Sequence, residues 1–131
     1  MSESEQLLRD ILCRALNVVV AAIALLHVYI LVLEMFLWTT PIGRRAFGLT
    51  PEFAQESAVL AANQGLYNGF LAAGLVWGLV AGGSVGFQAK VFFLVCVLVA
   101  GVYGAITANR RILFFQAVPG AIGLVLVLLA R

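Results

Sequence analysis

The 131-residue chain is 63% hydrophobic and 11% charged, and its mean hydropathy is +1.08. Soluble globular domains carry about 25% charged residues, so this composition excludes an ordinary soluble enzyme and indicates a membrane protein. The formal net charge is only +2, and the basic residues are spread over the expected loop ends. Without a basic stripe, nucleic-acid binding is excluded as well.

The first apolar stretch follows an acidic start, Met1-Ser-Glu-Ser-Glu-Gln. A signal peptide begins with a basic region and has a shorter apolar core, so we interpret this stretch as a membrane helix over 11–38. It contains the only histidine, His27, and, seven positions later, Glu34. Residues two turns apart share one helix face. A charge inside a membrane span is costly and by default marks a functional site.

Two threonine–proline pairs divide the connection that follows. The pair at 40–41 ends the first helix, because the residue before a proline disfavours the helical conformation. The Thr-Pro-Glu sequence at 50–52 supplies an N-cap, a proline in the first helical position and an acid against the helix dipole. We therefore expect a helix over 51–81 and, before it, a compact interfacial turn over 42–49.

The 51–81 helix carries the densest cluster of polar side chains in the chain. They are Asn63, Gln64, Tyr67 and Asn68. An amide in hydrocarbon has to find hydrogen-bond partners, so this face is expected to point into the bundle. At about 1.5 Å per residue from the helix ends, His27 and Asn68 both lie roughly 16 Å deep. We therefore expect two antiparallel helices, with the face of His27 and Glu34 against the face of Gln64 and Asn68.

Small residues also recur every four positions in this helix. One stripe is Ala61, Gly65, Gly69 and Ala73, and a second is Gly74, Gly78 and Gly82. Such stripes let another helix approach closely, and we interpret them as packing surfaces. A matching surface on the next helix consists of Ala100, Gly104 and Ala108.

Two more apolar stretches predict helices over 88–108 and 111–130. Each of the four stretches provides the roughly 20 residues of a membrane crossing. The predicted fold is all-α: a four-transmembrane-helix antiparallel bundle with a short interfacial segment between helices 1 and 2, forming a single domain over 1–131. Cys13 and Cys96 lack metal-ligand spacing and are interpreted as packing residues. No metal or cofactor is expected.

The polar residues of the third and fourth helices fall toward the same side as the first cluster. They are Tyr103, Thr107 and Gln116. The other half of the bundle is almost entirely apolar, which closes a route across the membrane and favours a pocket open to one face over a channel. Four arginines are expected at its rim, where they either attract an anionic head group or only anchor the helix ends. They are Arg44, Arg45, Arg110 and Arg111.

Within this pocket, His27 and Glu34 are a candidate catalytic acid–base pair. Burial brings the proton affinities of a carboxyl group and an imidazole together, which favours proton transfer. The amides and Tyr103 would orient a substrate oxygen or stabilise developing charge, as an isomerase or hydratase of a lipophilic substrate requires. In the structural alternative, Glu34 pairs with Arg44 or Arg45 or caps a loop backbone, and His27 hydrogen-bonds Asn68, without chemistry.

Three segments resemble the bacterial domain of unknown function 1304 family. They are His27-Val-Tyr-Ile-Leu-Val-Leu-Glu34-Met-Phe, then Thr40-Pro41-Ile-Gly43-Arg44 with Phe47-Gly48-Leu49, and Ala61-Ala62-Asn63-Gln64-Gly65-Leu66-Tyr67-Asn68-Gly69-Phe70. The resemblance covers nearly the whole chain. It implies a small multi-pass protein of the bacterial inner membrane, and it implies no particular activity.

Three functions therefore stay open. A ligand-binding pocket or enzyme requires a cavity on the arginine side, whereas a proton-coupled small-molecule transporter requires a path past Tyr29 or Trp77 to the other face. A structural or accessory subunit requires no cavity. Basic residues divide four to four between the two ends of the predicted bundle, so they set no orientation. The expected partners are membrane lipids, a small amphiphilic or anionic ligand and, through the glycine stripes, a second copy of the chain.

Overall fold

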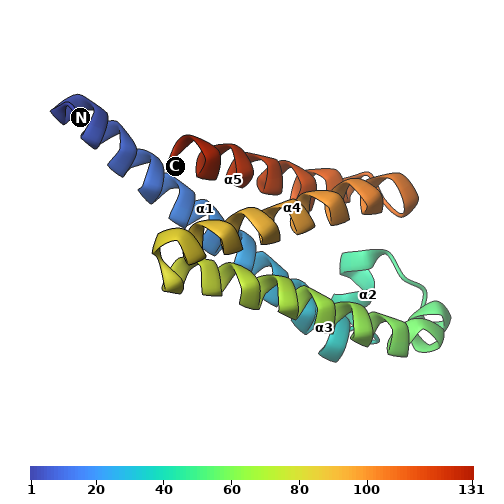
Figure 1. Ribbon diagram of the computed structural model, residues 1–131. Coiled ribbons are helices and arrows are strands. Elements are labelled where there is room, and N and C mark those ends of the chain that lie inside the picture. Colours follow the sequence, from blue (N-terminus) through green and yellow to red (C-terminus); the bar gives the residue numbers. More distant parts are fainter. The chain divides into compact units, whose positions relative to one another are not determined.

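The computed structural model describes residues 1–131, and all its regular elements are helices, as predicted (Figure 1). The elements are α1 (Glu3–Phe36), α2 (Pro41–Phe47), α3 (Pro51–Ala81), α4 (Gly83–Thr107), the π-helical segment η1 (Leu113–Ala117) and α5 (Val118–Leu129). The chain forms two compact units. We call Leu25–Ala72 the central unit, and Met1–Ala24 together with Ala73–Arg131 the terminal unit.

α1 begins at Glu3, well before the predicted residue 11. Ser2 and Glu5 form a capping box at this end. The Ser2 hydroxyl oxygen accepts a hydrogen bond from the Glu5 backbone N–H at 3.2 Å, and a Glu5 carboxylate oxygen accepts one from the Ser2 backbone N–H at 2.8 Å. The prediction treated this segment only as acidic and overlooked its Ser-x-x-Glu spacing, which signals a helix start.

The signal at Thr50–Pro51 is confirmed, whereas Thr40–Pro41 begins a helix and does not end the first one, which already ends at Phe36. The Thr50 hydroxyl accepts a hydrogen bond from the Phe53 backbone N–H at 3.1 Å, and α3 has the predicted bounds. The hydroxyl of Thr40 accepts one from the Gly43 backbone N–H at 3.4 Å, and here the cap begins a helix. α2 therefore replaces the predicted interfacial turn. It ends at Gly48, whose φ of +66° favours glycine.

The last predicted helix is divided by an irregular turn. α5 begins at Val118, and the residues before it form η1, which contains Gln116. Pro119 has no backbone N–H to donate to the preceding turn, so the regular ladder of hydrogen bonds cannot continue through it. A π-helical turn at this place accommodates the proline.

In the terminal unit, α4 packs along η1 and α5 (Figure 1). The closest approach is at Gly101, where an added Cβ would lie 2.8 Å from the Ala117 Cα. Gly104 faces Ile112 in the same way, with 3.1 Å from an added Cβ to the Ile112 Cγ2. The prediction that this surface of α4 faces the second long helix is therefore wrong. Because the connection at 108–112 is short, the small residues of α4 meet the next segment of the chain.

α3 instead approaches α4 near the turn between them. An added Cβ on Gly86 would lie 2.8 Å from the Gly78 carbonyl oxygen. Further along α4, the Lys90 ammonium donates a hydrogen bond to the Asn17 side-chain oxygen at 3.1 Å. Gly78 of the second predicted stripe thus lies in a contact between two helices, which agrees with the interpretation of this stripe as a packing surface.

Substitution of Gly101 tests this packing. We expect Gly101→Ala to lower the free energy of unfolding by about 1 to 2 kcal/mol, because the new methyl group meets backbone atoms of Ala117. Gly104→Ala is the matched control, since it meets only the side chain of Ile112, which can turn aside. Unfolding in mixed detergent micelles, followed by circular dichroism, should rank Gly101→Ala as the more damaging change. The reverse order would contradict the contact.

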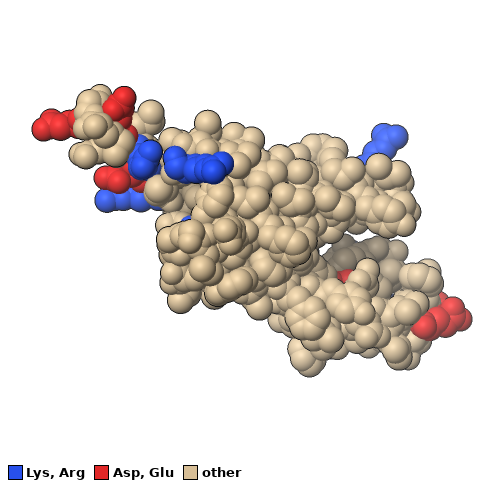
Figure 2. All heavy atoms as spheres, in the orientation of Figure 1, with Lys and Arg blue, Asp and Glu red and all other residues tan.

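Many large apolar side chains lie on the surface of both units. Figure 2 shows α4 and α5 of the terminal unit with an uncharged middle and with lysine and arginine at the ends. α1 and α4 are long and apolar enough to cross a membrane. Only 33% and 22% of their most apolar windows are buried, whereas a core helix of a soluble protein is mostly buried. These observations support membrane association.

By length and composition, the structure therefore has two candidate membrane spans rather than the four predicted. The apolar helix over Leu113–Leu129 is too short to meet the criterion. α3 is long enough, but the amides of Asn63, Gln64 and Asn68 reduce its hydropathy. Whether α3 can cross a membrane thus depends on what these amides bind.

Candidate functional site

The central unit joins Glu34 near the end of α1 to Asn68 in α3. The Asn68 side-chain nitrogen Nδ2 donates a hydrogen bond to Glu34 Oε1 at 2.6 Å. Both side chains are half-buried. Such a short bond is typical of a charge-assisted contact. The predicted meeting of the face of Glu34 with the face of Asn68 is present in the structure.

Gly65 allows this bond to form. An added Cβ at Gly65 would lie 2.6 Å from the Met35 Cγ, 3.1 Å from the Glu34 Cβ and 3.2 Å from the Leu31 carbonyl oxygen. The backbone of α3 therefore lies directly against α1 at this level. The first stripe of small residues has a packing role here, as predicted, and this packing places Glu34 beside Asn68.

The observed partner of Asn68 lies seven residues, or about two turns, further along α1 than the predicted one. Asn68 contacts Glu34, whereas the depth count placed it level with His27. That count began at Trp38 and Ser57, which do meet: the Trp38 indole N–H donates to the Ser57 hydroxyl at 3.0 Å. However, α1 ends at Phe36, so Trp38 lies outside the helix and the helical rise per residue does not apply to it.

Asn68 makes a second hydrogen bond that orients its amide group. Nδ2 also donates to the Gln64 backbone carbonyl at 3.1 Å. Both neighbours of Nδ2 are oxygen acceptors, so the nitrogen has to face them and Oδ1 has to point away. The amide thus bridges its own helix and the carboxylate of Glu34.

The other polar residues of the α3 cluster do not join this bond. Asn63 is exposed, and its Nδ2 donates to the Val59 carbonyl of its own helix at 3.0 Å. The Gln64 side chain is exposed. Tyr67 is also exposed, and its ring centroid lies 6.2 Å from that of Phe70. Of the predicted ligand-binding residues in α3, the structure brings only Asn68 to Glu34.

His27 also lies in the central unit and is completely buried, with 0% of its surface exposed. It is seven residues before Glu34 on α1. The predicted acid–base pair therefore combines a half-buried carboxyl group with an imidazole that has no exposed surface. A buried imidazole has no direct access to a ligand.

The arginines of α2 differ from each other in their surroundings. Arg45 is exposed, whereas Arg44 is half-buried and its Nε atom is buried without a hydrogen-bond partner. The partner that the structure gives to Glu34 is the amide of Asn68. The structural alternative, in which an arginine of this segment pairs with Glu34, is thus not the arrangement observed.

Sequence reasoning missed an aromatic contact that supports α2. The ring centroids of Trp38 and Phe47 lie 4.8 Å apart. Together with the bond from Trp38 to Ser57, this contact links the segment after α1 to both α2 and α3. A tryptophan just beyond an apolar helix was the available signal, because tryptophan is enriched at membrane interfaces.

The remaining candidate residues lie in the terminal unit. Tyr103 and Thr107 are exposed, and the Thr107 hydroxyl donates to the Tyr103 carbonyl at 2.7 Å. Gln116 is half-buried in η1. Arg110 and Arg111 are exposed. Glu34 belongs to the central unit, and a pocket that these residues share with Glu34 stays a prediction.

Cys13 and Cys96 are free thiols, and both are half-buried. No three His, Cys, Asp or Glu side chains come close enough together to hold a metal ion. In the central unit, the hydrogen bond between Glu34 and Asn68 is the contact that joins polar side chains of α1 and α3.

Comparisons with known proteins agree with the predicted resemblance. The model of the family described as "Protein of unknown function (DUF1304)" matches residues 21–128, which include the whole central unit. The "Uncharacterized protein YpaA" of Lactococcus lactis subsp. lactis (strain IL1403) is 30% identical over 96 residues, or 72% of this chain and 80% of that protein. No solved structure matches the chain.

Proposed function

The chain belongs to the family Protein of unknown function (DUF1304), and we propose that it is a multi-pass membrane protein that binds a small amphiphilic ligand at Glu34 and Asn68. The observation that carries this proposal is the 2.6 Å hydrogen bond from Asn68 to Glu34. It places a carboxylate between two apolar helices. The bacterial source of the relative supports a place in a bacterial cytoplasmic membrane.

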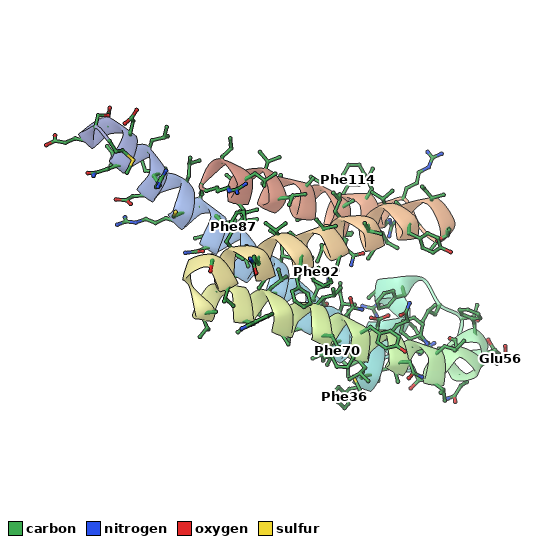
Figure 3. All side chains as sticks on the ribbon, in the orientation of Figure 1. Phe36, Glu56, Phe70, Phe87, Phe92 and Phe114 are labelled. Atoms are coloured by element: carbon green, nitrogen blue, oxygen red, sulfur yellow. The ribbon has the colours of Figure 1, made fainter.

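The same bond supports four crossings instead of two. An unpaired carboxylate or amide in hydrocarbon is costly, but each offsets part of the cost of the other when they are hydrogen-bonded. With Asn68 paired, α3 can cross next to α1, and η1 with α5 completes an even number of crossings. Phe36 and Phe70 lie on the same outer edge of the central unit in Figure 3, and both are exposed, as expected of side chains that face lipid.

Ligand binding is supported by the unused hydrogen-bonding capacity of the pair. An ionised carboxylate accepts about four hydrogen bonds, and Glu34 receives one, from Asn68. Polar groups in an apolar region are normally satisfied, so the remaining capacity favours a bound molecule. A molecule that reaches this site through the membrane has to carry an apolar part along with its polar group.

Binding is favoured over the acid–base catalysis that the sequence also suggested. A catalytic imidazole has to come within hydrogen-bond reach of its substrate. His27 is completely buried, whereas Glu34 and Asn68 are only half-buried. We therefore propose Glu34 and Asn68 as ligand contacts and His27 as a residue that supports the helix from within.

Mass spectrometry of the purified protein tests the proposal. Wild type and Glu34→Gln are purified in the same mild detergent, and small molecules released on denaturation are compared. We expect the variant to lose about tenfold or more of one bound molecule, because it lacks a charged acceptor. Glu34→Gln keeps a side-chain oxygen for Asn68, which preserves the helix contact.

Glu56→Gln is the matched control. Glu56 lies in the same unit, near the start of α3, and is exposed (Figure 3). This variant should retain the bound molecule at the level of wild type. Equal loads in all three proteins would contradict a ligand site at Glu34.

A further inference from the structure

The amide of Asn68 has no hydrogen-bond donor left to offer. The amide nitrogen of asparagine carries two hydrogens. In Asn68, Nδ2 donates to Glu34 Oε1 at 2.6 Å and to the Gln64 carbonyl at 3.1 Å. Both donors are thus occupied, and an incoming ligand meets no free N–H of this amide.

What the pair does offer is oxygen acceptors. The orientation of the amide turns Oδ1 of Asn68 away from Glu34. The bond from Asn68 uses Oε1 of Glu34, so Oε2 can still accept hydrogen bonds. At the neighbouring contact of Gly65 with α1, the atoms that an added Cβ would meet belong to Met35, Glu34 and Leu31, and none of them is a side-chain donor.

We propose that the polar group of the ligand is a cationic hydrogen-bond donor of the ammonium class, and this inference rests on the proposed function. A protonated primary amine has three N–H groups and one positive charge, which match two oxygen acceptors and one negative charge. It would keep Glu34 ionised and paired inside the apolar region.

The same geometry rejects an anionic head group at this position. An anion would meet a like charge at Glu34 and would find no donor on Asn68. Of the four arginines that suggested an anionic ligand, Arg45, Arg110 and Arg111 are exposed, and Arg44 is half-buried on α2 with a buried Nε that has no hydrogen-bond partner, whereas the bond that Glu34 makes is with Asn68. An anionic ligand, expected from the arginine rim, is therefore not the ligand proposed for this pair.

Four ten-carbon probes separate charge from hydrogen-bond donation. Decylammonium has both, decyltrimethylammonium has the charge without an N–H, decanol has a donor without a charge, and decyl sulfate is anionic. Binding to the full chain is counted by native mass spectrometry from neutral maltoside micelles. We expect decylammonium to bind wild type best and to lose about tenfold or more in affinity with Glu34→Gln.

Two further variants identify the cause of any loss. Glu56→Gln, which removes an exposed carboxylate from the same unit, should bind decylammonium like wild type. Glu34→Asp keeps the charge and should keep the preference for decylammonium over decyl sulfate. Each variant has to elute as a single species in size-exclusion chromatography. If Glu34→Gln misfolds, the comparison of the two probes in Glu34→Asp still tests the inference.

The inference is overturned if decyl sulfate binds in a Glu34-dependent way, or if decyltrimethylammonium binds as tightly as decylammonium. It is also overturned if no probe distinguishes wild type from Glu34→Gln. None of these results decides the proposed function, which depends separately on whether Glu34→Gln loses a co-purified molecule.

Discussion

Gly65→Ala is expected to lower the free energy of unfolding by about 2 to 3 kcal/mol. The new methyl group would lie 2.6 Å from the Met35 Cγ and 3.2 Å from the Leu31 carbonyl oxygen. The carbonyl belongs to the backbone of α1 and cannot rotate aside, so the two helices have to separate. Separation also breaks the bond from Asn68 to Glu34. Unfolding of the purified protein by titration with sodium dodecyl sulfate, followed by circular dichroism, measures the loss.

Gly69→Ala provides the control on the same helix face, one turn further along. There the added methyl group meets only the end of the Leu31 side chain, with 2.7 Å to its Cδ1. That side chain can adopt another rotamer, so we expect a loss of less than about 1 kcal/mol. Equal losses for the two variants would show that α1 and α3 do not approach at Gly65 as described.

Asn68→Leu is expected to cost about 2 to 3 kcal/mol in the same titration. The substitution removes the donor that Glu34 receives at 2.6 Å and leaves the carboxylate without this partner in an apolar contact. Removing one member of a polar pair is costly, whereas replacing both by apolar residues is nearly neutral. The double variant Glu34→Leu with Asn68→Leu should therefore recover most of the lost stability.

Asn63→Leu is the matched control for this substitution. Asn63 lies on the same helix, but it is exposed and bonds only to the Val59 carbonyl of its own helix. We expect its replacement to change stability by less than about 0.5 kcal/mol. If Asn68→Leu costs no more than Asn63→Leu, the bond between Glu34 and Asn68 does not hold the helices together.

The sequence predicted those helix ends whose signals are local. The start of α3 at Pro51 follows from a threonine cap, a proline and an acid, and the structure has this start and the predicted end at Ala81. The start of α1 was equally local, in the capping box of Ser2 and Glu5, but was overlooked because the segment was judged by its charge. The π-helical turn before Pro119 was not predicted, because the sequence alone does not show how the helix accommodates the proline.

The sequence predicted which residues belong to the site, but not which of them form a hydrogen-bonded pair. Glu34 and Asn68 stand out as polar residues in apolar helices, and their faces do meet. The register between the two helices depends on where α1 ends and on the turn that follows. The depth count continued the helix to Trp38, which the structure places beyond its end. It therefore paired Asn68 with His27 in place of Glu34.

By length and composition the structure has two candidate membrane spans in place of the four predicted, for a related reason. Hydropathy treats every amide as a cost, so α3 falls short because of Asn63, Gln64 and Asn68. The bond from Asn68 to Glu34 connects residues that are far apart in the sequence, and no local window contains both. A polar pair of this kind changes the cost of placing each helix in a membrane, and only the three-dimensional structure identifies the pair.

A structure of the full chain determined in lipid nanodiscs would show directly whether a ligand binds at Glu34 and Asn68. We expect a non-protein density within about 2.7 to 3.2 Å of Glu34 Oε2 and Asn68 Oδ1, with the hydrogen bond between the two residues intact. Protein side chains packed directly against both oxygen atoms, leaving no room for a ligand, would contradict it.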